Sequence, residues 1–187
     1  MSNNNKKGFS LIELLVVLAI MTIMGAIVVP KYASNKNAQA MKYAKTQIVN
    51  DIRYVQTYTL NTKKFPDGSP SPIGGYGIHF QKDKDYYTVF GDKRHAVDPN
   101  YLYDDSYPAG SADYEFYEQI DLVDGVHISK LTVNGTEVDS VDYVSTPPYG
   151  KIFIAELNTN VELEITYMNS ADDTGVVKAN SSGLIIN

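Results

Sequence analysis

Residues 9–29 read FSLIELLVVLAIMTIMGAIVV, an apolar run of 21 residues in which Glu13 is the only ionisable side chain. As an α-helix this run is roughly 30 Å long, at about 1.5 Å per residue, which matches the hydrocarbon core of a bilayer. A helix that is apolar on every side cannot be the amphipathic surface helix of a small domain. The run therefore predicts a transmembrane helix over residues 9–30.

A short polar leader, MSNNNKKG, precedes the apolar run. No small-residue cleavage site of the A-x-A kind follows the run before Pro30, so the segment is not an ordinary secretory signal. The order of residues in KKGFSLIEL, Lys6 to Leu14, resembles that of the type IV prepilin and pseudopilin family. This resemblance is local and covers about 25 residues.

The resemblance implies that a prepilin peptidase removes residues 1–8 by cutting after Gly8. It further implies N-methylation of Phe9 and retention of the apolar helix in the mature protein. Glu13 is then implied to act in filament assembly by pairing with the Phe9 ammonium of a neighbouring subunit. A carboxylate at the bilayer centre costs on the order of 3 kcal/mol, so this residue is a functional candidate. The alternative is that Glu13, one turn from the helix end, only reaches the headgroups.

Two residues near the end of the apolar run are helix breakers. Pro30 lacks the N–H that would bond to the carbonyl of Ala26, and Gly25 weakens the helix five residues earlier. We expect a helix break at Gly25 and Pro30, either as a kink or local melting or as a simple bend.

Residues 31–60 predict an amphipathic second half of the same helix. Apolar residues recur at spacings of three and four, at Met41, Ala44, Ile48, Ile52 and Val55. Basic residues lie between them, and residues 31–64 carry a net charge of +6. This basic face is either solvated or paired with acidic residues of the head or of neighbouring subunits.

The C-terminal part predicts a β-rich globular head over residues 76–187, after a Pro- and Gly-rich loop over residues 61–75. Short alternating segments are separated by turn signals, of which Asn134-Gly135 is the strongest. The expected strands are residues 76–81, 86–90, 130–133, 136–138, 151–157, 161–167, 175–179 and 183–186, with alternating positions on both sides of Asp124-Gly125. The predicted class is α+β, with a long N-terminal helix packed on an antiparallel β-rich head.

Composition excludes several kinds of chemistry. The chain has 187 residues and no cysteine, so disulfides, thiolate metal sites and a cysteine nucleophile are excluded. The three histidines, His79, His95 and His127, stand in no metal-ligand or catalytic spacing, and no phosphate-binding glycine loop is present. We expect no enzyme and no cofactor.

Residues 98–118 form a long loop rich in acids and tyrosines. Its carboxylates, Asp104, Asp105, Asp113 and Glu115 among them, are oxygen ligands of the kind that calcium takes, although their spacing fits no calcium loop. They are weak calcium candidates. The tyrosines are either a contact surface or part of an insertion packed on itself.

The resemblance of KKGFSLIEL to prepilins and pseudopilins implies a structural subunit of a bacterial type IV pilus or type II secretion-like filament. In the head, the stretches DGVHI, KIFIAEL and VELEITY and the final TGVVKANSSGLIIN hairpin are loosely similar to those of H-type minor pseudopilins of type II secretion. Expected partners are copies of the chain and other pilin-like subunits, prepilin peptidase, an inner-membrane assembly platform, and membrane lipid before assembly. The expected location is the inner membrane, single-pass, with the head outside the cytoplasm, and later a periplasmic or extracellular filament.

Two alternatives stay open. One is a single-pass, membrane-anchored binding or adhesion protein that does not polymerise. The other is a pilin for DNA uptake, which the charge disfavours because residues 65–187 carry a net charge of −13 and repel phosphates.

Overall fold

The structure is a computed structural model that describes residues 10–93, 99–106, 108–109, 111, 114–155, 161–169 and 173–186, without the side chains of residues 27–34 and 186. The chain divides into two compact units, residues 1–39 and residues 40–187. The second is called the head unit below.

One helix, α1, extends over Leu11–Leu60 and belongs to both units. It begins directly after Ser10, whose carbonyl oxygen accepts the N–H groups of Glu13 and Leu14 at 3.0 and 3.2 Å. It ends where Thr62 takes a positive φ of 47°, which no α-helix continues. The predicted long N-terminal helix is therefore confirmed.

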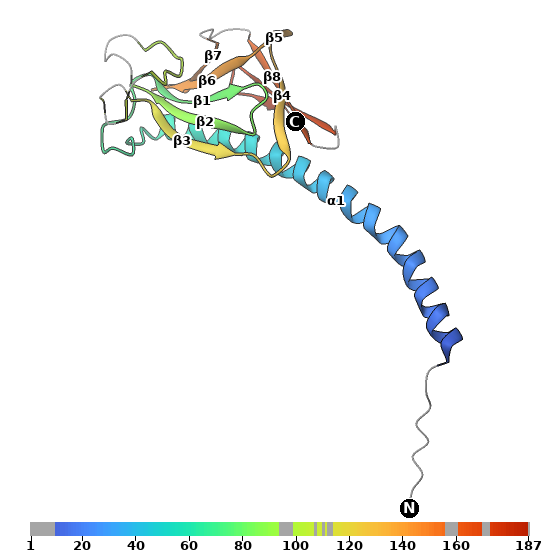
Figure 1. Cartoon of the computed structure of the whole chain (residues 1–187). Coiled ribbons are helices and arrows are strands. Elements are labelled where there is room, and N and C mark those ends of the chain that lie inside the picture. The colour runs from blue at the N-terminus through green and yellow to red at the C-terminus, as the bar shows by residue number, and fades with distance from the viewer. Residues whose placement is uncertain are drawn as a thin grey trace, which may run out of the picture. The chain divides into compact units, whose positions relative to one another are not determined.

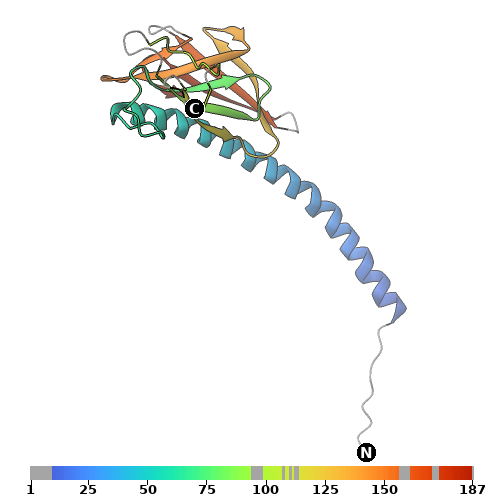
Figure 2. The same cartoon turned by 60° about the vertical axis from the view of Figure 1, so that its left-hand side comes forward.

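Ten strands follow the helix and form two antiparallel five-stranded sheets (Figures 1 and 2). Sheet A has the order β3 (Phe116–Asp121), β2 (Tyr86–Asp92), β1 (Gly75–Gln81), β6 (Ser140–Thr146) and β7 (Lys151–Ile154). Sheet B has the order β10 (Ile185–Ile186), β9 (Thr174–Asn180), β8 (Glu162–Asn169), β4 (Val126–Val133) and β5 (Thr136–Val138). The predicted α+β class with a β-rich C-terminal region is confirmed.

A single apolar core joins both sheets to the second half of α1, which lies along the sheets in both views (Figures 1 and 2). The predicted helical stripe provides one side of this core. Its members Ala44, Ile48, Ile52 and Val55 are fully buried, and Met41 packs against them. Ile78, Tyr143 and Ile154 are among the residues from sheet A, and Leu131, Leu163 and Val177 among those from sheet B.

The predicted strand arrangement lacks one strand. β6 was not predicted, although it is the strand between β1 and β7 in sheet A. The alternating segments on the two sides of Asp124-Gly125 do not pair with each other, because β3 pairs with β2 in sheet A whereas β4 pairs with β5 and β8 in sheet B. The turn instead carries the chain from one sheet to the other. The hairpin at Asn134-Gly135 is confirmed, with Val133 opposite Thr136.

Candidate functional site

The N-terminal motif lies at the start of α1. The cleavage residues Gly8 and Phe9 are outside the described residues. Glu13 is described and exposed, in the first turn of the helix. An acid in a first turn interacts favourably with the N-terminal end of the helix dipole, by about 0.3–1 kcal/mol. This position is compatible with the assembly role of Glu13 and does not test it.

The apolar side chains that follow are exposed around the whole helix. Large hydrophobic residues between Leu11 and Met24 have exposed fractions from 43% to 84%. They are Leu11, Ile12, Leu14, Leu15, Val16, Val17, Leu18, Ile20, Met21, Ile23 and Met24. A contiguous apolar surface of this kind marks a protein–protein or membrane interaction site rather than a solvated surface.

The predicted transmembrane helix over residues 9–30 is not confirmed, because no helix among the described residues is long and apolar enough to cross a bilayer.

The expected helix break at Gly25 and Pro30 is not seen as an interruption of secondary structure. The helix continues through both residues to Leu60. Proline is compatible with helical φ and removes a single backbone donor, so the hydrogen bonds on either side maintain the helix. Nothing lies within 4 Å of the position that a Cβ on Gly25 would occupy. A kink at these residues stays a prediction.

In the part of the chain that the structure describes, the basic residues of α1 between positions 42 and 53 are not paired with acids of the head unit. Among the described residues Lys42, Lys45 and Arg53 form no ion pair. Lys42 and Arg53 are exposed, as is Tyr43 at 69%. Of the two interpretations, pairing within the same chain is therefore not observed, and a solvated face or pairing with a neighbouring subunit stays open.

Described residues of the loop between β2 and β3 pack on the outer face of sheet A. Tyr101 stacks on Phe153 with the ring centroids 3.8 Å apart and the planes at 12°. Tyr103 packs against Phe90 at 5.3 Å. These two tyrosines thus attach the loop to the sheet. This arrangement is neither an exposed contact surface nor an insertion packed on itself. Tyr107 lies outside the described residues.

The calcium candidates do not come together as a site in the described residues, where no group of three suitable ligands occurs. Asp104 and Glu115 interact directly, since the Asp104 N–H donates to Glu115 Oε2 at 2.9 Å. Asp104 Oδ1 accepts hydrogen bonds from the N–H and the hydroxyl of Ser106. Asp105 is exposed, and Asp113 lies outside the described residues. Calcium binding stays untested.

His79 is more constrained than a solvent-facing strand residue. Its Nδ1 lies 2.8 Å from Asp142 Oδ1, and the two side chains are only 22% and 9% exposed. No pattern in the sequence signals this pair, because the carboxylate is 63 residues away, on the strand that was not predicted. His127 is half-buried on β4, and His95 lies outside the described residues.

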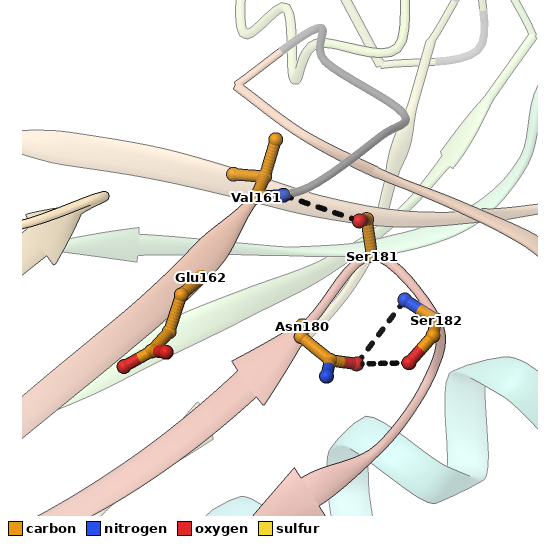
Figure 3. Close-up of a pocket in the computed structure, with 5 residues that line it drawn as sticks. All are labelled: Val161, Glu162, Asn180, Ser181 and Ser182. Atoms are coloured by element: carbon orange, nitrogen blue, oxygen red, sulfur yellow. Dashed lines mark hydrogen bonds between the residues drawn. The ribbon is translucent and has the colours of Figure 1, made fainter.

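A hollow of about 250 Å³ at the β9–β10 turn is lined by Val161, Glu162, Asn180, Ser181 and Ser182 (Figure 3). Asn180 Oδ1 accepts hydrogen bonds from the N–H and the hydroxyl of Ser182, at 3.1 and 2.6 Å. Ser181 Oγ accepts the N–H of Val161 at 3.2 Å. These polar groups shape the turn and join it to β8, so their role here is structural.

Comparison with known proteins identifies only the N-terminal region. Residues 3–29 match the prokaryotic N-terminal methylation motif, the class III signal of type IV prepilins and pseudopilins. This motif implies processing by a prepilin peptidase, membrane anchoring and assembly with other pilin subunits. No curated protein and no solved structure matches the chain. The likeness of the head to H-type minor pseudopilins therefore stays a prediction.

Proposed function

We propose that this chain, which carries the prepilin methylation motif, is a structural and non-catalytic subunit of a bacterial type IV filament. It is a minor pilin or pseudopilin, cut after Gly8, methylated on Phe9 and assembled through α1. Before assembly the apolar helix holds the subunit in the inner membrane, with the head outside the cytoplasm. After assembly the same helix lies in the filament core.

The observation that carries this proposal is the exposed apolar surface from Leu11 to Met24, directly behind the motif. Covering each Leu, Ile, Val or Met side chain contributes roughly 1.5–3 kcal/mol. Eleven such side chains are exposed on this segment, so the helix is strongly stabilised by lipid or by neighbouring helices. Glu13 then needs a cationic partner once the helix leaves the headgroups, and the Phe9 ammonium of a neighbour supplies it.

The test is intact-mass analysis of the chain in the membrane fraction of cells that hold the matching peptidase. We expect the parent to begin at N-methylated Phe9. A Gly8→Ala variant should keep residues 1–8, since the added methyl group obstructs the approach of the peptidase to the backbone. Gly25→Ala is the matched control, because a Cβ at that position contacts nothing within 4 Å; it should mature normally.

A parent that keeps Met1 or Ser2 contradicts the proposal and favours the alternative of a plainly anchored surface protein. The abundance of the chain relative to other subunits in purified filaments separates a major from a minor subunit. The acidic head argues against DNA uptake, because its net charge repels the phosphate backbone.

A further inference from the structure

A groove of about 320 Å³ lies on the outer face of sheet A, over β1, β2 and β3. The floor comes from the strands and one wall from the loop after β2. Its lining includes His79, Thr88, Tyr103, Asp105, Phe116 and Gln119. The volume is at the lower end of the range of roughly 300–1,000 Å³ that small-molecule sites occupy.

The floor is a row of polar residues set side by side by the strand register. Gln119 is opposite Thr88, Thr88 is opposite His79, and His79 is opposite Asp142. Directly opposite residues of antiparallel strands point to the same face, so these four side chains share the outer surface of the sheet. The row crosses the four strands β3, β2, β1 and β6. Thr88 and Asp142 are each only 7% exposed on this face, which residues of the loop cover.

The hydrogen-bonding groups of this row are held in place. The 2.8 Å contact between His79 Nδ1 and Asp142 Oδ1 holds the imidazole ring in place on the floor. Gln119 Nε2 donates to Asp121 Oδ1 at 2.8 Å, which orients the amide. These contacts fix the geometry of the floor before any ligand binds.

Aromatic rings and one carboxylate complete the walls. Tyr103 lies beside His79 with ring centroids 5.2 Å apart, and Tyr86 and Phe116 also line the groove. Burial raises the pKa of Tyr103 to about 12, so its hydroxyl stays protonated at neutral pH. Asp105 is exposed at the rim and supplies a charged acceptor.

This chemistry selects a neutral, polyhydroxylated ligand. None of the described lining residues is Lys or Arg, so an anionic ligand meets the Asp105 carboxylate with no cation in the lining itself. An apolar ligand would remove water from the polar groups of the lining, the Asp105 carboxylate above all, without offering them hydrogen bonds. A sugar offers hydroxyl donors to Asp105, acceptors for amide groups, and apolar C–H faces for the rings.

We propose that this groove binds a neutral saccharide, one or two rings in size, with Asp105 and Gln119 as hydrogen-bonding residues and Tyr86 and Phe116 as ring contacts. The site lies wholly in the head unit, so it does not depend on processing at Gly8 or on assembly. It assigns to the head a recognition function that the filament role does not include.

Saturation-transfer NMR on the full chain tests this, in a detergent without a sugar headgroup. The probes are glucose, galactose, mannose and N-acetylglucosamine, with glucuronate as an acidic comparison. We expect at least one neutral sugar to bind saturably, with no change on addition of EDTA. Glucuronate should bind more weakly than glucose.

Two exposed positions provide the variants. Asp105→Ala should weaken binding by about tenfold or more, because a hydrogen bond to a charged group is lost, and Gln119→Ala by about threefold. Asp124→Ala, an exposed carboxylate in the turn between the sheets, is the matched control and should bind like the parent. The proposal is overturned if no neutral sugar binds, if glucuronate alone binds, or if Asp105→Ala and Asp124→Ala bind equally.

Discussion

Thr59 connects the end of α1 to sheet A inside the core, and its replacement tests how the helix is held. Its hydroxyl donates to the carbonyl oxygen of Ser145 at 2.9 Å and accepts the N–H of Tyr76 at 3.0 Å. The residue is completely buried. A Thr59→Val substitution keeps the shape of the side chain and removes both hydrogen bonds.

The expected loss of stability follows from two backbone groups, the Ser145 carbonyl and the Tyr76 N–H, that lose Thr59 as their hydrogen-bond partner. A buried polar group left unsatisfied costs about 1–3 kcal/mol. The Ser145 carbonyl oxygen has a second lone pair, so losing the Thr59 hydroxyl costs this group less than it costs the Tyr76 N–H. We therefore expect Thr59→Val to lower the free energy of unfolding by about 2–4 kcal/mol. Thr59→Ser retains the hydroxyl and deletes one methyl group, which costs about 1 kcal/mol.

Urea unfolding of the full chain in detergent measures this difference. Tyrosine fluorescence is a suitable probe because the chain has fifteen tyrosines and no tryptophan. The midpoint of Thr59→Val should lie below those of the parent and of Thr59→Ser, with an unchanged slope. If the valine variant is as stable as the serine variant, the hydroxyl does not hold the helix and the reasoning is wrong.

Two further predictions concern carboxylates on α1. Glu13→Ala should mature like the parent but be depleted from sheared filaments. The control is Thr22→Ala, which changes an exposed polar residue of the same segment and should assemble normally. Equal incorporation of the two variants contradicts the assembly role of Glu13. Burial raises the pKa of Asp51, an effect that Glu118 reinforces and the hydrogen bond from Tyr87 opposes. The folded state therefore holds this proton more tightly than the unfolded state, and the stability contributed by Asp51 falls as the pH rises above 3.8. An Asp51→Asn variant cannot ionise at this position. As the pH rises from 3 to 7, its urea midpoint should therefore rise relative to that of the parent. A fall relative to the parent rules out this account.

The sequence predicted those features that depend on neighbours along the chain. The stripe of Ala44, Ile48, Ile52 and Val55 follows from helical periodicity, because residues three and four apart share one face. The hairpin at Asn134-Gly135 follows from turn chemistry, since both residues take a positive φ. The methylation motif is likewise a contiguous stretch, and it was recognised from nine residues, KKGFSLIEL.

The sequence did not predict β6 or the pairing of His79 with Asp142. The segment Ser140–Thr146 is buried at six of its seven positions and so lacks the alternation that marks a half-buried strand. The same strand carries Asp142 to His79, and only the register between β1 and β6 makes them neighbours. Tyr103 and Asp105 reach the groove because Tyr101 anchors their loop on Phe153, a contact between distant segments.

The sequence alone thus determined the α+β class, the long N-terminal helix with its apolar first half, and the motif for processing, because each rests on local spacing and composition. Only the tertiary structure decided which strands share a sheet, where the acidic loop lies, and which polar side chains face one another. Those features depend on strand register and on packing between residues far apart in the chain, and local periodicity carries no information about either.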